Sequence, residues 1–126
     1  MLFRSGKPFE QFARNVVTRI LIGEGFSAAN IIPKKFIDTE FRVFPDNNVI
    51  EIDGYSDDPA VIVEITSILR NQEKAEKFLK KKAYLEDVQK KPFRGFLVAA
   101  ATEITEHEKL DLIQRLREHR CELINL

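Results

Sequence analysis

The sequence predicts a single α/β domain over residues 1–126, with a central mixed sheet flanked by helices in the order α-β-β-β-α-β-α-β. Two observations predict this class: apolar residues recur with helical spacing in three segments, and short apolar runs rich in β-branched residues lie between them. A chain of 126 residues suits one domain with a sizeable core. Its 44% hydrophobic and 32% charged residues are typical of a soluble globular protein.

The first expected element is a helix in PFEQFARNVVTRILIGEGF, which begins at Pro8. Its apolar residues at helical spacing are Phe9, Phe12, Ala13, Val16, Val17, Ile20 and Leu21. Pro8 suits the first turn of a helix, and Gly23 or Gly25 suits its end. The stretch that follows, including IIPKK at 31–35, is expected to be a connection.

Three strands are expected next. FRVF at 41–44 predicts the first strand, and PDNN at 45–48 has turn chemistry. VIEIDGY at 49–55 alternates and predicts the second strand. SDDP at 56–59 indicates another turn, and VIVEIT at 61–66 the third strand behind it.

The second half of the chain predicts two helices and two strands. A helix is expected from 71 to about 91. Its expected inward residues are Ala75, Phe78, Leu79, Tyr84, Leu85 and Val88. A buried strand at 93–101 follows, and TEHE at 105–108 is a candidate capping box for a helix that ends near Arg120. CELINL at 121–126 is expected to close the sheet as its last strand.

Glu64 lies inside an otherwise apolar strand, where a buried carboxylate is costly unless it has a partner. Because side chains alternate along a strand, Glu51 and Asp53 share one face of theirs. A hairpin that pairs Ser56 with Val61 would place Asp53 opposite Glu64. The sequence therefore predicts two facing carboxylates on neighbouring strands.

Two acidic side chains that face each other repel, and two remedies are available. One carboxyl group can keep a proton with a raised pKa, or a divalent cation can lie between the two. Mg²⁺ prefers carboxylate oxygens, so Asp53 and Glu64 are candidate metal ligands. The alternative is that Asp53-Gly54 forms a turn and that Glu64 is exposed on an edge strand.

The order of elements resembles that of the PD-(D/E)xK nuclease superfamily, particularly its small archaeal and bacterial members and, more distantly, archaeal Holliday-junction resolvases. The residues that carry the resemblance are IEIDGY at 50–55, VIVEIT at 61–66, the lysine-rich helix at 73–88 and FLVAAATEIT at 96–105. The resemblance covers nearly the whole chain. It implies a restriction-endonuclease-like core.

The resemblance also implies a metal site that holds Mg²⁺ (or Mn²⁺). An aspartate on the second strand and an acidic residue on the third hold the ion in this family, and Asp53 and Glu64 match these positions. The first helix often adds an acidic residue, for which Glu10 is the candidate; alternatively, Glu10 is a solvated glutamate favoured by the helix dipole. Glu51 either contributes to the outer shell of the metal ion or is a solvated strand residue.

The sequence departs from the family at Thr66, where the motif has a lysine that positions the attacking water. Loss of one preorganised electrostatic contact costs about 3 kcal/mol, or roughly 10²- to 10³-fold in rate. Lys80 is the candidate replacement, because it precedes Tyr84 by four residues, a spacing found in several branches of the family. The alternative is that Lys80 belongs to a solvated basic stripe.

Nucleic-acid binding would depend on a local patch, because 20 basic and 20 acidic residues cancel. Lys77, Lys81 and Arg94 are the expected contacts, with Lys34 and Lys35 nearby candidates. The alternative is that these charges form an ordinary solvated face.

The sequence therefore favours a Mg²⁺-dependent DNA endonuclease with catalytic residues Asp53, Glu64, Thr66 and Lys80, or a nuclease-like protein that binds nucleic acid. Neutral net charge and Thr66 favour the alternative, a catalytically inactive domain that acts as a protein interaction or assembly module. DNA is the expected partner, together with a homodimer or a larger protein complex.

We expect a cytoplasmic location. No apolar run approaches the roughly 18 residues of a membrane span. The first 12 residues lack the long apolar stretch of a signal peptide. Cys121 is the sole cysteine, which excludes an internal disulfide and fits a reducing compartment.

Overall fold

The computed structural model describes residues 6–126 and confirms the α/β class and the predicted order of elements. In chain order the elements are α1 (Gly6–Gly23), β1 (Ile32–Ile37), β2 (Val49–Ser56), β3 (Val61–Leu69), α2 (Glu73–Gln89), β4 (Arg94–Thr102), α3 (Glu106–Glu118) and β5 (Cys121–Asn125). Residues 1–5, which belong to the stretch expected to lack a signal peptide, lie outside the described residues.

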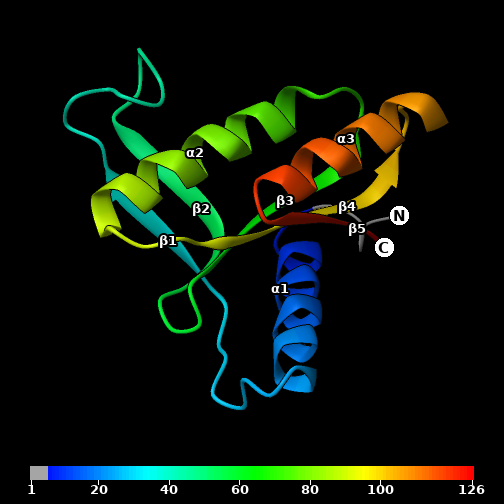
Figure 1. Cartoon of the computed structure of the whole chain (residues 1–126), viewed down its shortest axis with the longest axis horizontal. Helices are drawn as coiled ribbons and strands as arrows, with labels where there is room; N and C mark the ends of the chain where they lie inside the picture. Colours follow the sequence, from blue (N-terminus) through cyan, green and yellow to red (C-terminus); the bar gives the residue numbers. More distant parts are fainter. Residues whose placement is uncertain (1–5) are drawn as a thin grey trace.

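Within residues 6–126, five strands form one mixed sheet in the order β1-β2-β3-β4-β5 (Figure 1). β1, β2 and β3 pair antiparallel, whereas β3, β4 and β5 pair parallel. Parallel neighbours need a crossover connection, and α2 and α3 supply the two crossovers. None of the helices in this part of the chain is both long and apolar enough to cross a membrane.

The helices cover the sheet on both faces, with α2 and α3 on one face and α1 on the other (Figure 1). Phe78, Leu112 and Leu97 belong to the core beneath α2 and α3, whereas Val17 and Phe96 belong to the core beneath α1. Because consecutive residues of β4 enter opposite cores, this strand is buried on both faces, as a near-continuous apolar run predicts.

The predicted first strand at 41–44 is wrong, because the strand lies earlier, at β1 (Ile32–Ile37). β1 is an edge strand, which tolerates its proline, so IPKKFI does not need to look like a central strand. The 41–44 segment is instead a loop that the Asp38 carboxylate holds by accepting a hydrogen bond from the Val43 amide at 3.0 Å. Phe41 has φ +53°, which a strand does not allow.

The predicted hairpin register is confirmed: Ser56 pairs with Val61. Pairing between β2 and β3 runs only as far as Gly54 opposite Val63. Beyond that point β2 stays paired with β1 alone, and β3 with β4 alone. We call the place where β2 and β3 cease to pair, at Asp53 and Glu64, the fork.

β2 also contains an irregularity at the fork. Opposite β1, the register moves from Ile32–Tyr55 to Lys34–Ile52, so that β2 holds one extra residue over this interval. Ile52 and Tyr55 consequently enter the same core, although strict alternation would place them on opposite faces. Alternation is therefore lost between Ile52 and Tyr55, whereas Glu51 and Asp53, predicted to share one face, both line one cavity.

The crossover helices α2 and α3 follow the prediction except at two positions of α2, Lys82 and Val88. α2 buries Ala75, Phe78, Lys82 and Leu85. Val88, expected to point inward, is 49% exposed and lies one residue before the end of the helix. The predicted cap of α3 is confirmed: the Thr105 hydroxyl accepts a hydrogen bond from the Glu108 amide at 3.1 Å.

Candidate functional site

Asp53 is fixed at the fork by contacts on both sides. Its Oδ2 accepts a hydrogen bond from the Ile65 amide at 2.8 Å, and its carbonyl oxygen accepts one from Arg14 Nη1 at 2.9 Å. The following residue must be glycine, because a Cβ on Gly54 would lie 2.9 Å from the Cβ of Val63. The close approach of the two strands thus places the Asp53 carboxylate beside β3.

Glu64 is the buried acid of the site, with only 7% of its surface exposed. Burial raises the pKa of its carboxyl group to about 7, the nearby Lys81 ammonium opposes this shift, and the charge of Asp53 adds to it. The interaction with Asp53 supports the predicted proximity of the two acids. Of the two remedies that the sequence suggests, a raised pKa is present.

Lys81 supplies the positive charge at the fork. Its Nζ lies 3.3 Å from Glu64 Oε1 and donates a hydrogen bond to the carbonyl oxygen of Glu51 at 2.8 Å. The side chain is only 13% exposed, so solvent screens this contact weakly. The sequence suggests Lys81 as a nucleic-acid contact, but the structure places it against the acidic pair.

Lys80, the predicted replacement for the motif lysine, does not reach the acidic pair. It is exposed and lines a separate cavity of about 290 Å³ with Arg42 and Tyr84. Successive residues of an α-helix point about 100° apart, so only one of two adjacent lysines can face the fork. The structure gives that place to Lys81, which corrects the expectation for Lys80.

Thr66 occupies the position of the family's lysine and is buried. It lies two residues after Glu64 on β3 and therefore on the same face of the strand. Its hydroxyl donates a hydrogen bond to the Ile68 carbonyl oxygen at 3.2 Å. Thr66 thus brings no charge to the fork, and its proton is committed to its own strand.

A cavity of about 460 Å³ opens beside the fork, between α1, β1 and β2. The residues that line it are Lys7, Glu10, Arg14, Pro33, Lys34, Lys35, Glu51, Ile52 and Asp53. Glu10 and Asp53 therefore both line this cavity, whereas Glu64 contacts Lys81 from α2.

The predicted three-carboxylate metal set is not assembled as such. Among residues 6–126, no group of three or more His, Cys, Asp or Glu side chains is arranged to hold a metal ion. Mg²⁺, however, is commonly bound through one or two carboxylates with waters and substrate phosphates completing its shell. The oxygen donors of Asp53 and Glu64 fit that requirement chemically.

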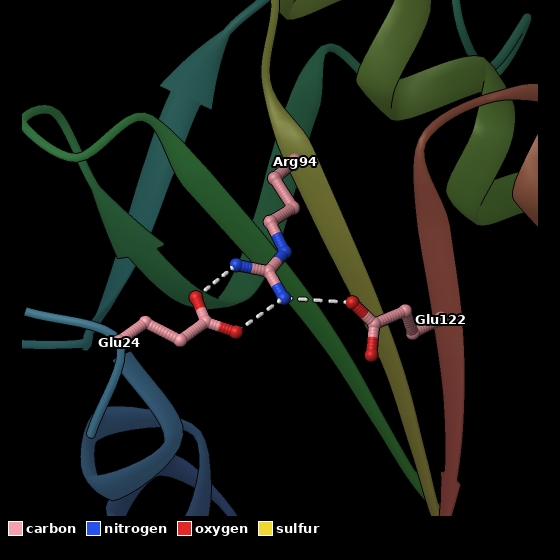
Figure 2. A network of polar contacts seen from close by, with 3 residues as sticks. All are labelled: Glu24, Arg94 and Glu122. Atoms are coloured by element: carbon pink, nitrogen blue, oxygen red, sulfur yellow. Dashed lines mark hydrogen bonds and ion pairs between the residues drawn. The ribbon is translucent and has the colours of Figure 1, made fainter. Parts of the chain in front are cut away.

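The other two predicted nucleic-acid contacts are engaged elsewhere. Lys77 is exposed and pairs with Glu73 at 3.1 Å within α2. Arg94 donates hydrogen bonds to both carboxylate oxygens of Glu24, at 2.5 and 3.0 Å, and to Glu122 at 2.7 Å (Figure 2). The Arg94 guanidinium thus links the end of α1 to β5 and does not project into solvent.

Sequence reasoning missed Arg14. This arginine is 7% exposed on the sheet-facing side of α1 and contacts the backbone of Asp53. The available signal was its spacing: Arg14 follows Glu10 by four residues, so both point the same way from the helix.

No protein-family model matches the chain, and no curated protein or solved structure matches it either. The resemblance to the nuclease superfamily therefore rests on the residues of the fork and on the order of the elements.

Proposed function

We propose that the protein is a Mg²⁺-dependent nuclease with a restriction-endonuclease-like core that hydrolyses phosphodiester bonds in DNA. The observation that carries this proposal is the convergence of Asp53, buried Glu64 and Lys81 at the fork. A strongly shifted pKa beside a specific charged partner is typical of functional sites.

The topology supports the same proposal. A helix, a three-strand meander, a crossover helix and a fourth strand follow one another as in the family whose motifs the sequence resembles. The two carboxylates lie on the second and third strands, where that family carries its metal ligands. A cavity lined by Asp53 and Glu10 opens beside the fork, where a ligand could reach the Asp53 carboxylate.

Asp53 and Glu64 would hold the metal ion, with Glu10 facing the adjoining cavity. When bound, Mg²⁺ supplies Lewis acidity and lowers the pKa of a coordinated water. The raised pKa of Glu64, about 7, means that metal binding displaces a proton below neutral pH.

Lys81 would provide the charge that Thr66 lacks. Its ammonium group lies at the acidic pair, so it can donate a hydrogen bond to a phosphate oxygen or to the attacking water. The proposal therefore moves the role of the family's lysine from β3 to α2. Thr66 then has a structural role, in which its hydroxyl donates a hydrogen bond to the Ile68 carbonyl oxygen of the same strand.

Cleavage assays test the proposal directly. Plasmid, single-stranded and branched DNA are incubated with Mg²⁺ or Mn²⁺ and the wild-type, D53N, E64Q or K81M protein. We expect cleavage by the wild type and a loss of about 10²- to 10³-fold in K81M. K77M is the matched control, because Lys77 is an exposed lysine of the same helix, and it should retain full activity.

One observation favours the second candidate, an inactive nuclease-like domain that acts as an interaction or assembly module. Lys81 pairs with Glu64, and the Ile65 amide bonds to Asp53, so the acidic pair has protein partners without a metal. Absence of both Mg²⁺ binding by calorimetry and DNA cleavage would favour this candidate. A gain of activity in T66K would indicate a decayed active site.

A further inference from the structure

Arg14 is a buried cation that has no carboxylate partner among the described residues. Its guanidinium donates to the carbonyl oxygen of Asp53 at 2.9 Å and to Gln11 Oε1 at 3.2 and 3.4 Å. These acceptors are neutral, so they satisfy hydrogen bonds but do not neutralise the charge. Burial of a charge without a counter-ion is costly, which makes Arg14 a site of attraction for an anion.

The guanidinium also keeps unused donors. Arginine has five N–H groups, and the bonds to Asp53 and Gln11 use three of them. Two donors on neighbouring nitrogens remain, which is the arrangement that binds a phosphate group in a bidentate way.

Arg14 borders the cavity of about 460 Å³ beside the fork. Three lysines, Lys7, Lys34 and Lys35, line the same cavity. Its volume falls within the roughly 300–1,000 Å³ typical of small-ligand sites. The carboxylates of Glu10, Glu51 and Asp53 line the cavity as well. Lys35 pairs with Glu51 at 3.7 Å, and the Lys34 ammonium lies over the Tyr55 ring at 4.7 Å. Within the described residues, Arg14 is thus the buried cation of this cavity that has no carboxylate partner.

The position of Arg14 relates this cavity to the fork. Arg14 is bonded to the backbone of Asp53, whose carboxylate faces β3, so the cavity and the acidic pair share one residue. A nucleic-acid strand whose scissile phosphate lies at the fork can therefore place a neighbouring phosphate against Arg14.

We propose that this cavity binds a backbone phosphate of the nucleic-acid strand next to the one that is cleaved, with Arg14 at its base and Lys7 and Lys35 at its rim. The inference rests on the proposed function for the identity of the substrate. It assigns substrate binding to α1 and β1, on the side of the sheet opposite α2.

Binding is measured without cleavage. Fluorescence anisotropy of a labelled single-stranded oligodeoxynucleotide is recorded in EDTA over a series of salt concentrations. We expect R14Q to bind about tenfold more weakly and to lower the slope of log affinity against log salt by about 0.7, the value for one lost phosphate contact on single strands. R117Q is the matched control, an exposed arginine on α3, and should bind as the wild type does.

Because Arg14 is buried, R14Q could lose affinity by misfolding, and a second variant tests the cavity independently. Lys7 and Lys35 are exposed, so K7Q/K35Q tests the same cavity without disturbing the core. We expect this variant to melt at the wild-type temperature and to reduce both affinity and salt slope.

The outcomes separate the two proposals. If the wild type does not bind the oligonucleotide, or if both cavity variants bind as tightly as R117Q, the phosphate site is refuted even when DNA is cleaved. If binding depends on Arg14 but the wild type shows no cleavage with Mn²⁺, the nuclease proposal fails and the phosphate site stands.

Discussion

The pH dependence of stability tests the electrostatics of the fork, and E64Q is the variant that isolates it. Glutamine has nearly the shape of a protonated glutamic acid but cannot ionise. E64Q therefore removes the titration of Glu64 and leaves the volume of the buried side chain unchanged. The attraction between Lys81 and ionised Glu64 is one of the causes that set the pKa of Glu64, so E64Q removes it together with the titration.

The magnitude follows from the pKa of Glu64. An ordinary value of 4.5 rises to about 7 in the folded protein. At about 1.4 kcal/mol for each pKa unit, ionisation of the folded form costs about 3 kcal/mol. Between pH 4.5 and about 7 the folded protein holds a proton that the unfolded chain has lost, so this group makes stability fall as pH rises through that window.

Urea unfolding of the wild type and E64Q at intervals from pH 5 to 8 measures the effect. We expect the difference in free energy of unfolding, E64Q minus wild type, to increase by about 2–3 kcal/mol from pH 5 to 8. Most of the proton release from Glu64 lies within this range. E118Q, at an exposed glutamate of α3, is the control, and its free energy of unfolding should vary with pH as that of the wild type does. If E64Q also runs parallel to the wild type, Glu64 is not held in a buried, proton-retaining environment and our account of the fork is refuted.

Four further predictions use the same protein. K81M removes the charge that lowers the pKa of Glu64, so its pH-dependent loss of stability should move to higher pH in the same urea series; an unchanged midpoint would contradict this. Mg²⁺ at pH 8 should raise the melting temperature of the wild type but not of E64Q, and equal shifts in both would exclude Glu64 as a ligand. G54A should cost about 1–3 kcal/mol in urea unfolding, because its Cβ would overlap Val63. R94A should lower the melting temperature by detaching α1 from β5, yet leave oligonucleotide affinity unchanged; weaker binding would restore Arg94 as a nucleic-acid contact.

The sequence predicts the elements well where their pattern is strong and fails where an edge or a loop breaks the rules. VIVEIT is apolar enough to be a strand in any context, and β3 begins at Val61 as predicted. β1 was missed because an edge strand accepts a proline and two lysines that a central strand would not. FRVF has strand composition, but the Asp38 carboxylate and the positive φ of Phe41 hold it as a loop.

The acidic pair could be predicted because the 56–59 turn sets the register of the hairpin. The irregularity at Asp53 could not, because an extra residue in one strand leaves no reliable mark on alternation. The choice between Lys80 and Lys81 was equally open, since it depends on the rotation of α2 about its axis. That rotation is decided by tertiary packing, in which Lys82 is buried although Val88 is not.

The buried lysine of α2, Lys82, offers a comparison for the charges at the fork. Lys82 lies 2.9 Å from Glu86 Oε2, which also accepts a hydrogen bond from the Phe93 amide at 2.8 Å. That pair joins the end of α2 to the start of β4 through direct, short bonds. The Lys81–Glu64 contact is longer, at 3.3 Å, and leaves Glu64 with a pKa of about 7. Both lysines join α2 to the sheet, since Lys81 also donates to the Glu51 carbonyl oxygen at 2.8 Å. What our proposal attributes to a ligand at the fork is the cost of burying the Glu64 carboxyl group, which raises its pKa to about 7.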